Sequence, residues 1–131
     1  MKPLTFLLAL LFSSSFSNAQ TTGPAFTWDK NTHDFGDIIQ GEKVEHTFKF
    51  TNTGTEPLVI TNVEVTCGCT TPKGWPRDPI NPGGRGEITV QFDSTHKIGR
   101  QNKVSTIISN ASAGNSQVTF SVNVLEKKKT K

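Results

Sequence analysis

Hydrophobic and polar residues alternate along several short stretches of this chain. Between Val44 and Thr51 the even positions are apolar or aromatic, apart from His46, and the odd positions are polar or charged. The alternation is equally regular over 87–93, and apolar residues occupy every second position over 118–124. A period of two predicts β-strands that bury one face and leave the other in water. Helical periodicity of useful length is absent after residue 20, so the chain is predicted to be all-β.

About seven short strands with turn residues between them predict an immunoglobulin-like antiparallel β-sandwich. In this fold, two facing rows of apolar side chains form the core. The predicted strands are 25–29, 33–38, 44–51, 58–65, 87–93, 104–109 and 118–124, and 98–102 is predicted to be a turn. The expected core residues are Val44, Phe48, Phe50, Ile88, Val90, Phe92, Val118, Phe120 and Val122.

The connection after the third predicted strand resembles a hairpin. Asn52-Thr53-Gly54-Thr55 contains two residue types that tolerate the positive φ of tight hairpin turns. The sequence therefore predicts that 44–51 pairs with 58–65 in one antiparallel hairpin. That pairing would place His46 across from residues near Val63.

The strand 58–65 changes its apolar phase part-way along. Leu58 and Ile60 are even-numbered, whereas Val63 and Val65 are odd, and a β-bulge near 61–62 would reconcile the two phases. On the odd phase, the two cysteines of Cys67-Gly68-Cys69 would follow Val63 and Val65 on one face of the strand, which is expected to point at the core or at its rim.

The longest irregular segment follows the cysteines. Four prolines lie within 70–84, with Trp75 in the middle, and Pro82-Gly83-Gly84 closes the segment in a turn. Because proline lacks an N–H donor and fixes φ, we expect a loop without a regular strand or helix.

The first residues resemble a secretory signal peptide. Lys2 supplies a positive charge, Leu4 to Phe12 are mostly apolar, and Ser17-Asn18-Ala19 fits a small-residue cleavage site before Gln20. The apolar run is shorter than the roughly 20 residues that span a bilayer. We therefore expect residues 1–19 to be a signal peptide, 25–126 the sandwich domain and 127–131 a basic tail. The protein is predicted to be exported to the periplasm or the cell exterior and not to span a membrane.

Charge adds little to this prediction. The 131 residues carry a formal net charge of +3, and basic residues are not interleaved with exposed aromatics as in nucleic-acid-binding proteins. We expect no nucleic-acid partner. The run Glu126 to Lys131 is typical of a solvated tail.

Several motifs resemble one known family, domain of unknown function 1573. They are Phe48 to Leu58, Cys67-Gly68-Cys69-Thr70, Pro79-Ile80-Asn81-Pro82-Gly83, Gly86, Asp93, Gly99 and Ser109-Asn110. The resemblance covers about 35–124 and implies an immunoglobulin-like fold related to Hydin-type sandwiches, in exported proteins largely of Bacteroidetes. It implies no activity.

The two cysteines are the residues of this sequence most able to carry out chemistry. In an oxidising compartment Cys67 and Cys69 are predicted to form a disulfide or to pack as a structural pair. A redox-active pair is an alternative. Two thiolates on one strand face would also suit Cu(I) or half of a zinc site, with His46 as a possible third ligand.

Other candidate residues give weaker signals. Trp75 is predicted either to close one end of the sandwich or to contact a partner. No G-x-S-x-G motif, calcium-loop spacing or supported Cys-His arrangement occurs, so neither catalytic residues nor a cofactor are predicted.

The sequence thus predicts a non-enzymatic exported binding or structural module with a protein or envelope component as its partner. The alternative functions are metal handling through the Cys-Gly-Cys element and thiol–disulfide redox chemistry.

Overall fold

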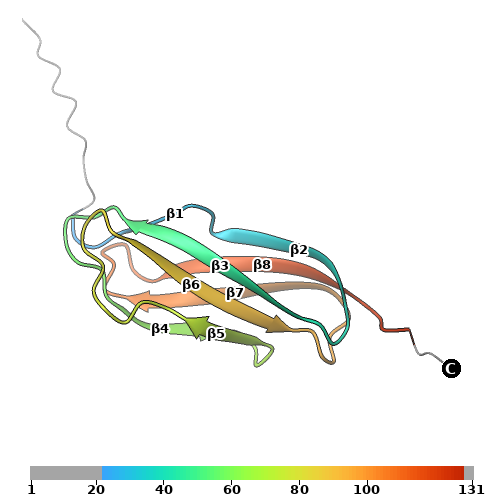
Figure 1. The fold of residues 1–131 in the computed structure, drawn as a ribbon. Coiled ribbons are helices and arrows are strands. Elements are labelled where there is room, and N and C mark those ends of the chain that lie inside the picture. The colour runs from blue at the N-terminus through green and yellow to red at the C-terminus, as the bar shows by residue number, and fades with distance from the viewer. Residues whose placement is uncertain (1–21, 129–131) are drawn as a thin grey trace, which may run out of the picture.

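The computed structural model describes residues 22–128, which contain no helix and form two facing four-stranded sheets (Figure 1). The first sheet has the order β1-β3-β6-β5, and the second has the order β2-β8-β7-β4. The predicted all-β, immunoglobulin-like sandwich is confirmed. The eight strands are β1 (Phe26–Trp28), β2 (Thr32–Ile39), β3 (Lys43–Asn52), β4 (Ile60–Val65), β5 (Thr70–Gly74), β6 (Arg85–Asp93), β7 (Gly99–Ser109) and β8 (Ser116–Leu125).

Two of the predicted segments lie partly or wholly outside the described residues. The predicted signal peptide, 1–19, is outside, as is the end of the predicted basic tail from residue 129. Residues 22–128 include no helix that is long and apolar enough to cross a membrane.

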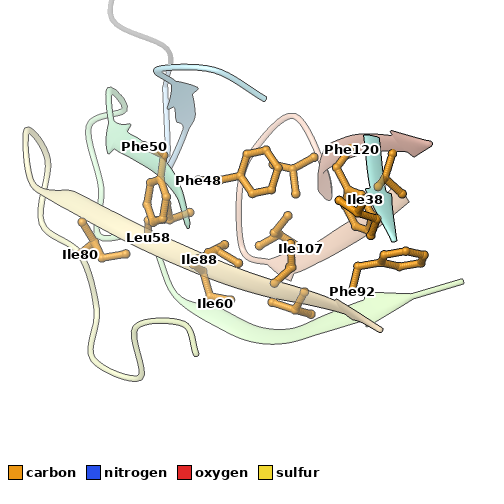
Figure 2. Packing of buried hydrophobic residues seen from close by; sticks show 14 of the residues in the cluster. Ile38, Phe48, Phe50, Leu58, Ile60, Ile80, Ile88, Phe92, Ile107 and Phe120 are labelled. Atoms are coloured by element: carbon orange, nitrogen blue, oxygen red, sulfur yellow. The ribbon is translucent and has the colours of Figure 1, made fainter. Parts of the chain in front are cut away.

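The alternating pattern of the sequence becomes the core between the sheets. Phe48, Phe50, Ile88, Val90 and Phe92 are all at most 1% exposed and project from the first sheet. Ile107 and the apolar row of β8 face them from the second sheet (Figure 2). At one point Phe92 meets Phe120 edge to face, with ring centroids 5.6 Å apart. Burial of these apolar side chains is the main force that holds the two sheets together.

A glycine in β6 makes room for one core aromatic. Gly86 pairs with Phe50, and a Cβ atom at position 86 would overlap the Phe50 ring. Phe26 and Trp28 of β1 pack on the same ring, at centroid distances of 4.9 Å and 5.1 Å. The short strand β1 is thereby fixed to the first sheet by aromatic contacts as well as by backbone pairing.

The predicted hairpin at 52–55 is wrong. β3 and β4 lie in opposite sheets, and β3 pairs with β6 and β1. Asn52 and Gly54 do not adopt positive φ. Instead the Asn52 side chain is fully buried and holds the crossover between the sheets.

The Asn52 amide makes four hydrogen bonds to the backbone. Its Oδ1 accepts from the N–H groups of Ala25 and Gly54, and its Nδ2 donates to the carbonyls of Glu56 and Ile80. These groups belong to the segment before β1, the crossover and the loop before β6. A buried amide whose hydrogen-bonding atoms are all used in this way fixes the relative positions of the three segments.

The predicted bulge in β4 is confirmed. The register of β4 against β7 shifts between Ile60 and Asn62, and Ile60 and Val63 are both buried. The extra residue rotates the strand so that even and odd apolar positions reach the same core.

The prediction that 70–84 contains no strand is wrong at its beginning. β5 spans Thr70–Gly74 and pairs with β6, although Pro72 lies within it. β5 is the edge strand of its sheet, so it has no neighbouring strand on its outer side. The N–H group that proline lacks is therefore not needed for a ladder hydrogen bond there. The ladder shifts register between Pro72 and Gly74.

The second sheet differs from the prediction in two further ways. β7 already begins at Gly99, so the predicted turn over 98–102 is largely strand. β2 pairs with β8 in parallel, with a register shift at Gly36, which has a φ of 71°. β1 and β2 follow each other in the chain but join opposite sheets, which lets the N-terminal segment close one side of the sandwich.

Replacement of Asn52 by alanine should strongly destabilise the domain. The change leaves the two backbone N–H groups and the two carbonyls without their partner, which should lower the free energy of unfolding by about 2–4 kcal/mol. Urea unfolding followed by tryptophan fluorescence measures this loss. Asn62→Ala is the matched control, because Asn62 is exposed on β4; equal effects of the two substitutions would contradict the role given to Asn52.

Candidate functional site

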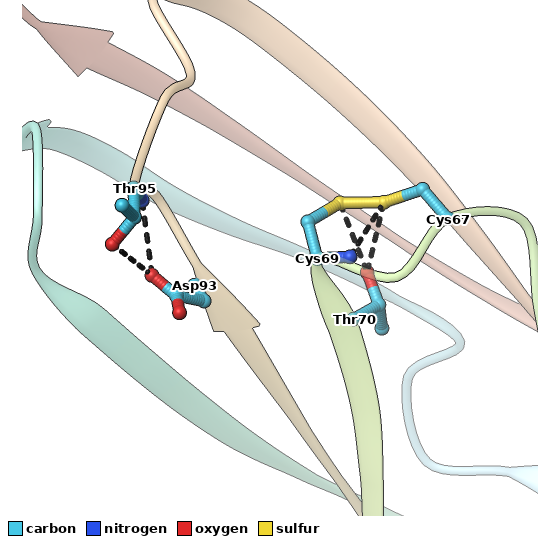
Figure 3. The surroundings of a disulfide bond; sticks show 5 residues. All are labelled: Cys67, Cys69, Thr70, Asp93 and Thr95. Atoms are coloured by element: carbon cyan, nitrogen blue, oxygen red, sulfur yellow. Dashed lines mark hydrogen bonds between the residues drawn. A yellow bond between two sulfur atoms is a disulfide. The ribbon is translucent and has the colours of Figure 1, made fainter.

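The two cysteines lie in the turn that joins β4 to β5, where the chain passes from one sheet to the other. β4 ends at Val65, so Cys67 and Cys69 do not continue its strand; both residues are half-buried, and Cys69 packs against the core. Their Sγ atoms are joined in a disulfide, with the Cα atoms 5.3 Å apart (Figure 3). This Cα separation lies within the range of ordinary disulfides.

Hydrogen bonds hold the disulfide turn against the neighbouring strands. The Cys69 N–H points at the Cys67 Sγ at 3.3 Å, and the Thr70 Oγ1 lies 4.0 Å and 3.9 Å from the two sulfur atoms (Figure 3). The Asp93 N–H donates to the Cys69 carbonyl at 2.8 Å. Thr70 is only 4% exposed. The turn is therefore part of the packed structure, while its sulfur atoms stay half-exposed.

His46 does not lie beside the cysteines. It pairs with Val90 of β6, and β6 separates β3 from β5. Since neighbouring strands lie about 4.8 Å apart, the His46 backbone is roughly 10 Å from β5 across the sheet. Within residues 22–128, no group of three or more His, Cys, Asp or Glu side chains is arranged to hold a metal ion. The structure thus brings no third ligand to the cysteine pair from His46.

His46 instead stacks on His33, which lies on β2 in the opposite sheet. The ring centroids are 3.6 Å apart and the rings are 9° from parallel. Phe35 and Phe48 meet the pair edge-on, with Phe35 4.6 Å from His33 and Phe48 4.7 Å from His46. Burial lowers the pKa of His46 below its ordinary value, and the nearby charge of His33 lowers the pKa further. The pair is a stacked contact between the sheets, which the sequence did not reveal because its two members belong to different predicted strands.

Trp75 follows β5 and packs against the core. Its indole is partly buried, its Nε1 atom is buried without a hydrogen-bond partner, and the Arg77 guanidinium lies 3.9 Å from the ring centroid. This position resembles the predicted closure of one end of the sandwich. Arg77 is exposed and covers the outer face of the Trp75 ring. The sequence did not indicate this contact, because a separation of two residues does not by itself predict stacking.

The two buried serines of residues 22–128 differ in their hydrogen-bond partners. The buried Ser94 Oγ donates to the Glu42 carbonyl at 2.6 Å and accepts from the Gly41 N–H, so it is engaged in backbone contacts. Ser105 is buried and its Oγ has no partner. Among residues 22–128, no hydrogen bond joins a histidine to a serine or a carboxylate.

Comparison with protein families decides which family the domain represents. The family described as "Protein of unknown function (DUF1573)" matches residues 26–124, which is most of the chain and the whole sandwich. The chain belongs to this family. The resemblance expected from the sequence motifs is thereby confirmed. A comparison with curated proteins finds no match for this DUF1573 domain.

Solved structures share the sandwich at low sequence identity. A protein of unknown function from Porphyromonas gingivalis W83 superposes with a TM-score of 0.66 and 19% identity, over 85% of this chain and 51% of the other. The secreted serine protease VesC from Vibrio cholerae gives 0.59 and 15%, over 82% and 24%. The ASH/PapD-like domain 7 of human CEP192 gives 0.58 and 11%, over 98% and 99%.

These likenesses show the fold alone. This chain spans about half of the Porphyromonas protein and about a quarter of the protease. The match to the ASH/PapD-like domain of CEP192 covers nearly all of both chains, so the two share the sandwich fold along their length.

Removal of the disulfide should destabilise the DUF1573 domain only slightly. A bridge between residues two apart closes a very small loop, so loss of the bond in the Cys67→Ser/Cys69→Ser variant should cost about 1–2 kcal/mol of unfolding free energy. Chemical denaturation of the two proteins measures the difference. A loss of about 4 kcal/mol or more would show that the bond constrains much more than its own turn.

Acidification should weaken the contact between the sheets at the histidine pair. Because the pKa of folded His46 lies below the unfolded value of 6.5, the unfolded chain binds more protons between those two pKa values. The stability contributed by neutral His46 is complete above about pH 6.5 and is lost as the pH falls towards the folded pKa. Thermal unfolding between about pH 7 and pH 5 should therefore show a steeper decline for the wild type than for His46→Gln. Parallel pH profiles would contradict this.

Proposed function

We propose that this DUF1573 domain is an exported, non-enzymatic binding module of the bacterial cell envelope. It presents the segment 67–84 to a partner protein. The proposal accords with the membership of a family without an assigned activity and with the complete match to an immunoglobulin-like or PapD-like domain. Such sandwiches offer the loops at their ends and their free strand edges as binding surfaces.

The observation that carries the proposal is that this long segment is held rigidly at several points. The disulfide closes its beginning, and Trp75 packs on the core in its middle. Near its end, Ile80 and Leu58 exchange two backbone hydrogen bonds of 2.8 Å, and Asn52 binds the Ile80 carbonyl. A segment that is ordered before binding loses little conformational entropy when a partner docks.

The outer side chains of the segment suit a protein partner. Lys73, Arg77, Asp78 and Pro79 are exposed, and the Arg77 guanidinium rests on the Trp75 ring. Arginine and tryptophan are enriched among residues that dominate protein–protein binding energy. Arg77 combines a flat stacked face with donors that remain available to a partner carboxylate. We infer that Arg77, backed by Trp75, is the central contact.

Site-directed photo-crosslinking in the native envelope tests this function. The full chain carrying p-benzoylphenylalanine in place of Asp78, which is exposed beside Arg77, should yield a discrete crosslinked partner. The same group in place of Lys30, which is exposed at the opposite side of the sandwich between β1 and β2, should not. The partner should be lost when Trp75→Ala removes the support of Arg77.

The location of the protein in the same cells tests the proposed export. The mature protein should be recovered from the periplasm or medium with an N-terminus at Gln20, measured by mass spectrometry. Retention in the cytoplasm with residues 1–19 attached would overturn the envelope assignment. Identical crosslinks from positions 30 and 78 would overturn the choice of surface.

A further inference from the structure

The three exposed large apolar side chains of the described residues lie side by side. Ile39 and Leu125 are each 41% exposed, and Ile98 is 52% exposed. Ile39 pairs with Leu125 across β2 and β8, and Gly99 pairs with Val124 across β7 and β8. Ile98 is the residue before Gly99, and extending the register by one residue brings it opposite Leu125. The exposure and register of the three side chains give a row on the outer face of the second sheet. This row lies at the end of the sheet where the chain leaves β8 (Figure 1).

A charged row follows the apolar row on the same face. Asp37 of β2, Asn123 of β8 and Arg100 of β7 are register neighbours. The Asn123 Nδ2 donates to the Asp37 Oδ1 at 3.0 Å. Arg100 makes only a 3.9 Å contact with Asp34, and both side chains are 58% exposed. So loose a surface pair contributes little, which leaves the Arg100 guanidinium available to another carboxylate.

The outer face of the first sheet differs in kind. Its rows pair Lys49 with Glu87 and Thr47 with Thr89 in β3 and β6, and Arg85 binds Asp29 at 2.6 Å. The Arg85–Asp29 ion pair on that face is closed within the chain, and the exposed large apolar residues all lie elsewhere in the described region. The face formed by β2, β8 and β7 carries the exposed apolar residues together with a carboxylate and a loosely paired guanidinium.

We propose that this face binds a second copy of the chain about a two-fold axis that runs along β8. β8 is flanked by the acidic side of β2 and the basic side of β7. Rotation about β8 places Ile39 over Ile98 of the second copy and Leu125 over its counterpart. It also places Asp37 over Arg100 of the second copy, and each contact occurs twice.

An axis perpendicular to the strands would lack this match. It would bring each residue of the apolar row over its own counterpart and leave Asp37 and Arg100 outside the contact. Charge complementarity therefore selects the axis along β8, since ion pairs across an interface fix its register. A hollow bounded by Thr32, Asn102, Val104 and Ser121 lies further along the same face. Direct contact is thus concentrated at the apolar and charged rows, and we expect a reversible dimer in the class of small interfaces.

Charge exchange across the axis provides a sharp test. Sedimentation equilibrium of the mature chain should show dimerisation with a Kd of about 10–100 μM, as expected for a small interface. Asp37→Arg places two arginines together, and Arg100→Asp places two aspartates together, so each variant should dimerise at least about tenfold more weakly. The mixture of the two variants restores both ion pairs and should form a heterodimer. The double variant Asp37→Arg/Arg100→Asp should again form a homodimer.

Three controls keep the test specific. Lys49→Glu and Glu87→Lys change charges on the outer face of the first sheet and should leave dimerisation unchanged. Ile98→Ser should weaken dimerisation at least about tenfold, while circular dichroism shows a folded sandwich. Co-sedimentation with phosphatidylglycerol vesicles distinguishes a lipid surface as the occupant of the apolar row.

The outcomes that overturn the proposal are distinct. A wild-type chain that stays monomeric to about 1 mM excludes the second copy as a partner at any useful strength. A dimer that is insensitive to both charge reversals uses another face or another axis. A monomeric chain that binds vesicles through Ile98 assigns the row to a membrane surface.

Discussion

The buried side chain of Asn52 is the interaction on which the arrangement of this domain depends. The strand pattern alone would let β3 and β4 form a hairpin, and the two sheets would then be connected differently. Four hydrogen bonds from one amide to the segment before β1, the crossover and the loop before β6 instead direct the chain into the opposite sheet. Burial of the Asn52 amide without hydrogen bonds would cost free energy. The side chain and its four backbone partners therefore stabilise one another only when all three segments are in place.

The crossover determines where the chemically interesting residues lie. Because β4 joins the second sheet, the cysteines fall in the turn that returns the chain to the first sheet, and not on the face of a continuous strand. The same topology holds His46 on β3 against His33 and keeps it away from the sulfur atoms. The cysteine pair is thus a local closure at the start of the segment 67–84, in which Trp75 packs against the core and Arg77 is exposed on the Trp75 ring.

The sequence predicts some parts of this structure well, for identifiable reasons. Alternation over β3, β6 and β8 reports directly which side chains face the core, because successive residues of a strand point to opposite sides. The phase change between Ile60 and Val63 requires an extra residue, so the bulge at Asn62 follows from the pattern alone. Pro72 misleads, because proline is compatible with a strand at the sheet edge, and the position of a strand within its sheet is not a local property. The stack of His33 on His46 could not be predicted either, because it depends on which strands face each other across the two sheets.

By itself, the sequence determined the all-β class, the core rows, the bulge and the family, since each depends on residue type and on spacing along one strand. The tertiary structure decided which strands are neighbours, and with that the sheet to which β4 belongs, the edge position of β5 and the parallel pairing of β2 with β8. It also brought Ile39 of β2, Leu125 of β8 and Ile98, which directly precedes β7, to one end of the second sheet. Strand pairing arises from contacts between residues far apart in the chain. Local periodicity carries no information about those contacts, so it predicts the faces of each strand and not the partners that the faces meet.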